Sequence, residues 1–152
     1  MKKLLSVLLS GVLVLSLSAC GEKAPAAFDP QDTTQALLDE AGVFAETLEP
    51  IDQATACALY GIDETTVTAS AVYMANATSA EELAIFTLTD EEAAQTAAKQ
   101  LGYRVSDRIE ELTSYLPGEV PKLEGAMVET RGNSVLLLVC SDYDGAKKVL
   151  EK

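Results

Sequence analysis

An amphipathic stripe over residues 91–116 constrains the fold of this chain more than any other feature of its sequence. Apolar side chains recur there every three or four residues, a spacing typical of a helix with one buried face. The stripe consists of Ala94, Ala97, Ala98, Leu101, Val105, Ile109, Leu112 and Leu116. Asp90 precedes it as a helix N-cap and Pro117-Gly118 ends it. The sequence therefore predicts one long helix, with a weak point at Gly102.

Segments rich in Val, Thr and Leu flank this helix and predict two β-hairpins. Strands are expected over 67–75 and 83–88, and again over 122–130 and 133–141. An aspartate and a helix follow each hairpin, with Asp90 and Asp142 offset by 52 residues. Strands joined by short turns pair antiparallel. We expect an α+β fold, a four-stranded antiparallel sheet from two ββα units with helices packed on one face.

Two short helices are expected before the first hairpin. Asp32 or Thr33 begins one that ends near Gly42, and the other covers 52–60 and ends at Gly61. Residues 31–152 would then form a single domain of ordinary size, large enough to fold without disulfides.

Residues 1–19 have the pattern of a secretory signal peptide. Lys2 and Lys3 are followed by an apolar core of 14 residues, shorter than the about 20 that span a bilayer as a helix. The sequence Leu17-Ser18-Ala19-Cys20 resembles the lipobox of bacterial lipoproteins. That resemblance implies a thioether-linked diacylglycerol on Cys20, with acyl chains such as palmitate. An uncleaved anchor helix and an ordinary secretion signal are the alternatives.

The lipidation hypothesis places the protein at the cell membrane, lipid-anchored on its extracytoplasmic face, because two acyl chains anchor a protein stably. Residues 20–30 would be the lipidated Cys20 and a flexible tether. Without residues 1–19 the chain has 9 basic and 24 acidic residues, a net charge near −15. This charge argues against nucleic acid, whose phosphates require a basic surface.

The chain contains no histidine. Hydrolases that use Ser-His-Asp or Cys-His within one chain are therefore excluded, as are zinc sites that use imidazole. Besides Cys20, the cysteines are Cys57 and Cys140. They are either buried thiols, which behave as small apolar groups, or a disulfide, which persists outside the cytoplasm.

Several polar motifs are candidate sites, and each also has a purely structural interpretation. The stretch Asp142-Tyr143-Asp144-Gly145 resembles the opening of a calcium loop, but it also fits a helix N-cap. Glu81-Glu82 and Glu110-Glu111 are paired acids, as a glycosidase needs, or solvated faces. Arg104 and Arg108 are one turn apart and either clamp an anion or pair with nearby Glu side chains. Asn76-Ala77-Thr78 matches a glycosylation sequon. None of these nominates a catalytic, cofactor-binding or metal-ligating residue.

Four stretches in order resemble an uncharacterised family of Gram-positive lipoproteins, domain of unknown function 4358. They are residues 59–63, 80–86, 115–120 and Gly132-Asn133 before the last apolar strand. The resemblance covers about residues 33–150 and implies a lipid-anchored extracytoplasmic protein. It carries over no catalytic residue.

Two functions from different classes remain open at the sequence level. The first is a membrane-anchored binding or interaction module, whose partner is an envelope protein or peptide. The second is a carboxylate-based hydrolase acting on cell-envelope glycans or peptides, which needs two acids converging in a pocket, one with a raised pKa.

Overall fold

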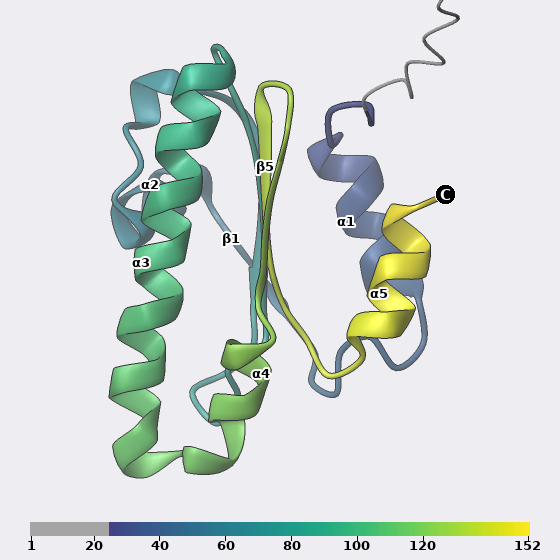
Figure 1. Cartoon of the computed structure of the whole chain (residues 1–152), viewed down its shortest axis with the longest axis vertical. Helices are drawn as coiled ribbons and strands as arrows, with labels where there is room; N and C mark the ends of the chain where they lie inside the picture. Colours follow the sequence, from purple (N-terminus) through teal and green to yellow (C-terminus); the bar gives the residue numbers. More distant parts are fainter. Residues whose placement is uncertain (1–24) are drawn as a thin grey trace, which may run out of the picture.

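A computed structural model describes residues 25–152 of the chain (Figure 1). Its helices, strands and 3-10 turns follow one another as α1 (Pro30–Asp39), β1 (Glu49–Ile51), α2 (Gln53–Tyr60), η1 (Glu64–Thr66), β2 (Val67–Met74), β3 (Glu82–Leu88), α3 (Glu91–Tyr115), η2 (Pro117–Glu119), α4 (Val120–Glu124), β4 (Met127–Arg131), β5 (Ser134–Val139) and α5 (Tyr143–Leu150). The fold is α+β, as the sequence predicts.

The strands form one antiparallel sheet in the order β1-β2-β3-β5-β4. It has five strands rather than the expected four, because residues 49–51 add β1 beside β2. β1 is only three residues long and contains Pro50, so neither length nor alternation reveals it in the sequence. A short edge strand with a proline also limits unwanted pairing with other chains.

Helices cover both faces of the sheet, so the expectation that they pack on one face is wrong. In Figure 1, α2, α3 and α4 lie on one side and α1 and α5 on the other. The cause lies in β5, where every residue is buried. Val135, Leu137 and Val139 pack under α3, while Leu136 and Leu138 pack against the opposite core, which holds Leu37 of α1. A strand apolar on both faces needs cover on both.

The two-unit repeat is not confirmed. Both hairpins are followed by a helix capped by an aspartate, since Asp90 accepts from the Ala93 N–H and Asp142 from the Gly145 N–H. However, α3 and α5 lie on opposite faces of the sheet (Figure 1). The two helices therefore share only an aspartate N-cap, and they do not belong to a repeated packing unit.

Individual boundaries differ from expectation, most clearly in two places. Residues 120–124 form α4 rather than the start of a strand, because Leu123 packs into the core below α3. At the other end, Phe28, Asp29 and Pro30 belong to the folded part and not to a tether. The Phe28 side chain is buried, its N–H donates to Ser134 Oγ at 2.7 Å, and Asp29 caps α1.

The long helix and the second short helix are confirmed. α3 runs from Glu91 to Tyr115 and buries Ala94, Ala97, Leu101 and Leu112. α2 ends at Gly61, whose φ of 67° is the left-handed conformation that favours glycine at a helix C-terminus. Among residues 25–152, no helix is long and apolar enough to cross a membrane.

Candidate functional site

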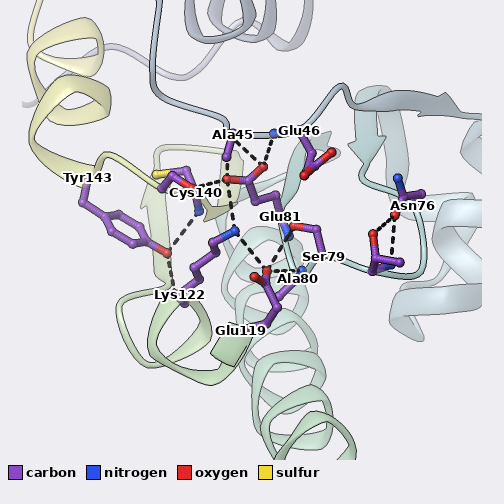
Figure 2. A network of polar contacts seen from close by, with 12 residues as sticks. Ala45, Glu46, Asn76, Ser79, Ala80, Glu81, Glu119, Lys122, Cys140 and Tyr143 are labelled. Carbon is purple, nitrogen blue, oxygen red and sulfur yellow. Dashed lines mark hydrogen bonds and ion pairs between the residues drawn. The ribbon is translucent and has the colours of Figure 1, made fainter. Parts of the chain in front are cut away.

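Glu81 is at the centre of a polar network at the end of the sheet where β3 begins (Figure 2). Its side chain is fully buried. The carboxylate accepts hydrogen bonds from the backbone N–H groups of Ala45 and Glu46, at 2.8 to 3.0 Å. It also accepts from Ser141 Oγ at 2.5 Å, and Lys122 Nζ lies 3.6 Å from Oε1. Three segments far apart in the sequence therefore meet at one side chain.

Lys122 links Glu81 to a second carboxylate, that of Glu119 in η2 (Figure 2). Lys122 Nζ lies 3.0 Å from Glu119 Oε2, which also accepts from the Ala80 N–H at 2.9 Å and from Ser79 Oγ. Burial alone would raise the pKa of Glu119, but the Ala80 N–H and Lys122 outweigh it and lower this pKa. Glu119 is therefore held in its ionised form.

This network has the character of a structural clamp. A general acid must carry a proton near neutral pH, whereas Glu119 has a lowered pKa. Both Glu81 oxygens already accept from N–H, O–H or ammonium donors of the chain itself. The network ties the loops that precede β1, β3 and α5 to α4.

The prediction that Glu81 and Glu82 lie on a solvated face is wrong, because both side chains are buried. Glu82 points to the face opposite Glu81, where Arg104 Nη2 lies 3.3 Å from its Oε2. The Arg104 guanidinium is also 5.9 Å from the centre of the Tyr60 ring. Burial, followed by the nearby Glu82 carboxylate, raises the pKa of the Tyr60 hydroxyl well above its ordinary value.

The two arginines of α3 meet glutamates, as one of the two interpretations predicts. Arg104 pairs with Glu82, and Arg108 Nη1 lies 2.7 Å from Glu111 Oε2. Glu110 and Glu111 themselves are exposed, in agreement with a solvated face. The arginines are thus neutralised by partners within the chain and present no clamp for an external anion.

Cys57 and Cys140 are free thiols, both buried. Cys57 packs in the core under α3 and Cys140 in the core on the opposite face, so the sheet separates them. Burial raises the pKa of the Cys140 thiol to about 12 and also raises that of Cys57. Thiols of this kind are poor nucleophiles, and the disulfide alternative is wrong.

The remaining motifs have structural roles. Asp142 caps α5, and Asn76 Oδ1 accepts from the Thr78 N–H in the turn between β2 and β3. In the part of the chain that the structure describes, no group of three or more acidic or cysteine residues is arranged to hold a metal ion. Cys20 and the signal sequence lie outside the described residues.

A groove of about 380 Å³ lies between the C-terminal end of α2 and the first turns of α3. Ile62, Ala93 and Ala97 give it an apolar wall, and Thr66, Thr89, Thr96 and Gln100 supply hydroxyl and amide groups. Asp63, Asp90 and Glu92 also line this α2–α3 groove. No basic side chain lines it. Its volume is within the about 300–1,000 Å³ typical of small-ligand sites.

Two of the three acids of the α2–α3 groove are helix caps. Asp63 accepts from the N–H and hydroxyl of Thr65, which lowers its pKa, and Asp90 accepts from the Ala93 N–H. Hydrogen bonds fix both carboxylates in place, and the lowered pKa of Asp63 favours its charged form. The groove can therefore attract a cationic group, whereas the lowered pKa of Asp63 is the opposite of the raised pKa that the acid of a glycosidase needs.

Sequence comparison gives this domain a family. A family model described as Domain of unknown function (DUF4358) matches residues 42–140, more than half of the chain. The chain belongs to this family. The DUF4358 region contains the whole α2–α3 groove and all five strands. A larger hollow of about 650 Å³ beside Phe28 and the C-terminus is lined mainly by residues outside it. No curated protein and no solved structure matches the chain.

The groove was missed at the sequence level because its wall comes from two separate connections, α2 to β2 and β3 to α3. Its residues are short polar and small apolar side chains, which have no motif of their own. The one available signal is that Asp63 and Asp90 each begin a helical turn after an apolar segment. Because β2 begins and β3 ends at the same end of the sheet, these two caps place their carboxylates near each other.

Proposed function

We propose that this DUF4358 domain is the binding module of a Gram-positive lipoprotein, anchored through Cys20 on the extracytoplasmic face of the membrane. The α2–α3 groove is the observation that carries the binding role. It is concave, falls within the family region and is lined by three acids without a base. The partner we propose is an envelope protein or peptide that inserts a basic side chain there.

Charge supports a cationic partner. The groove carries Asp63, Asp90 and Glu92, and hydrogen bonds from their own helical turns hold the first two carboxylates in place. The net charge of −13 for the full chain adds a long-range field that attracts cationic groups. The hydrolase alternative has weaker support, because two of the groove acids are helix caps and the Glu81–Glu119 pair is bridged by Lys122.

A pull-down with a groove-blocking variant tests the binding role. Thr96→Arg places a long cationic side chain in the groove, whereas Gln95→Arg adds the same charge at an exposed position that does not line it. We expect a defined partner to be recovered from envelope extract by the wild type and by Gln95→Arg, but not by Thr96→Arg. Equal recovery by both variants would contradict the assignment of the groove.

Membrane fractionation tests the anchor separately. Cys20→Ala removes the thiol that would carry the lipid, so we expect the protein to leave the membrane fraction. Glu22→Gln keeps the thiol and is expected to stay there. Retention of Cys20→Ala in the membrane would show that lipidation of Cys20 does not hold the protein.

A further inference from the structure

The point at which the chain enters the domain is fixed at one end of the sheet. The Phe28 N–H donates to Ser134 Oγ at 2.7 Å, and the Phe28 ring lies 4.2 Å from the Arg131 guanidinium carbon. Ser134 and Arg131 flank the two-residue loop of the β4–β5 hairpin. The domain is therefore attached beside the tip of this hairpin, which lies at the top of Figure 1.

The same end of the sheet carries the start of α3. The Leu88 N–H, at the end of β3, donates to the Asn133 carbonyl at 2.8 Å, and the Asn133 amide donates back to the Leu88 carbonyl. Three residues later α3 begins and runs the length of the sheet. It ends next to η2, where Glu119 bonds the Ala80 N–H just before β3. We call these the Phe28 end and the Glu119 end.

Covalent length then decides which end can reach a membrane. Eight Cα–Cα steps join Cys20 to Phe28, which span at most about 29 Å when fully extended. α3 has 25 residues and is about 37 Å long. If the Glu119 end lay on the bilayer, Phe28 would be farther from the surface than the connecting segment can reach. The inverted orientation is therefore excluded for a chain held by Cys20.

Charge separates the two orientations that remain, upright and lying flat. Acidic residues outnumber basic ones 24 to 11 in the chain, so anionic lipid headgroups repel the domain. Lying flat would bring Asp107, Glu110 and Glu111 close to these headgroups in addition to Glu91 and Glu92, whereas standing upright keeps the first three more than about 20 Å further away. That distance is beyond the screening length of about 8 Å.

We infer that the domain stands on the membrane with its Phe28 end toward the bilayer and its Glu119 end facing away. This inference rests on the proposed lipid anchor at Cys20. In this orientation the surface that faces the lipid consists of the β4–β5 hairpin tip, the start of α1 and the first turn of α3. The α2–α3 groove, which Thr89 and Asp90 line, begins at this membrane-facing end. Its partner is then a component met close to the membrane surface.

Energy transfer from the lipidated protein to acceptor lipids tests the orientation. Glu91→Cys and Ser114→Cys place a fluorophore at exposed positions near the two ends of α3. Cys57 and Cys140 are buried and Cys20 carries the lipid, so the new thiol is the reactive one. In vesicles that contain anionic lipid and headgroup-labelled acceptors, we expect transfer several-fold stronger from position 91 than from position 114. Equal transfer, or stronger transfer from position 114, would overturn the inference.

A lengthened connection provides the control. Twelve extra residues after Ala24 add about 40 Å of reach, so the covalent restriction disappears and the difference between the two positions is expected to shrink. An unchanged difference would show that the connecting segment does not set the orientation. Flotation of the vesicles reports the anchor itself, because a protein that fails to float lacks the lipid that the proposed function requires. A failed orientation and a failed anchor are thus told apart.

Discussion

At the scale of single residues, Glu81 is the side chain on which the most distant parts of the chain depend. It is fully buried and bonds the loop before β1, the residue before the Asp142 cap and Lys122 of α4. Replacing one carboxylate oxygen by an amide NH₂ places a hydrogen-bond donor where an acceptor faced other donors, and it leaves Lys122 paired with Glu119 alone.

We expect Glu81→Gln to lower the free energy of unfolding by about 2–4 kcal/mol, because it leaves buried donors without an acceptor. Glu46→Gln makes the same chemical change at an exposed side chain and is expected to change the stability by less than about 0.5 kcal/mol. Urea unfolding of both variants in a Cys20→Ala background measures the difference. Similar unfolding midpoints for the two would contradict the clamp role of Glu81.

Glu119 gives a prediction about pH. Its pKa is lowered in the folded protein, so the ionised form stabilises the fold above the unfolded-state pKa of about 4.3. This contribution is lost as the pH falls through the lower, folded-state pKa. We expect Glu119→Gln to be less stable than the wild type above about pH 5, and the gap to close as the pH decreases. A gap that stays constant from pH 7 to pH 3 in urea unfolding would show that this carboxylate is not linked to stability.

At the scale of elements, two glycines should respond in opposite directions to substitution by alanine. Gly61 ends α2 with a positive φ of 67°, whereas Gly102 lies inside α3 with helical geometry and open space around it. Only at Gly61 does an added Cβ meet backbone strain.

We therefore expect Gly61→Ala to destabilise the protein by about 1–2 kcal/mol. Gly102→Ala removes a flexible residue from a helix interior and is expected to stabilise it by about 0.5–1 kcal/mol. Thermal unfolding followed by circular dichroism compares the two directly. A stabilising Gly61→Ala would mean that the end of α2 does not need the left-handed conformation.

The elements also show what the sequence could predict and what it could not. The stripe of α3 and the caps Asp90 and Asp142 depend on neighbours three or four residues away, so they are visible in sequence. The burial of Glu81 depends on donors from residues 45, 122 and 141, which no local pattern reveals. Adjacent acids such as Glu81 and Glu82 usually mark a solvated face, and only the β3 alternation sends them into opposite buried layers.

The groove and the helical cover on both faces of the sheet likewise depend on segments that are distant in the sequence. The α2–α3 groove is built from two connections that meet only in the folded chain, and its short side chains form no motif. The unbroken apolar run of β5 correctly indicates a strand with little solvent on either side. Such a strand requires helices on both faces of the sheet, and α1 and α5 cover the face that α3 leaves open.

At the scale of the whole molecule, the folded domain begins at Phe28. Its ring is buried with Leu37 and Leu83, and Asp29 caps α1 by accepting from the Gln31 and Asp32 N–H groups. A chain that begins at residue 31 loses both the buried Phe28 ring and the Asp29 cap of α1.

We expect such a chain to be less stable than one that begins at residue 25 by about 4–6 kcal/mol, from the lost phenylalanine and the lost cap. Chemical unfolding of the two chains gives the difference. A third chain that begins at residue 27 retains Phe28 and Asp29 and is expected to match the longer one. Equal stability of all three would place residues 28–30 outside the folded unit.

The strands β3 and β5 contribute side chains to both hydrophobic layers, alternately along each strand. Neither layer can lose its order while the other stays intact, because the same backbone supports both. The two sides of the sheet should consequently melt together, as one cooperative unit, with equal calorimetric and van't Hoff enthalpies. Damage on the α1–α5 side, far from the groove, would then reduce binding at the groove by lowering the fraction of molecules that are folded at all.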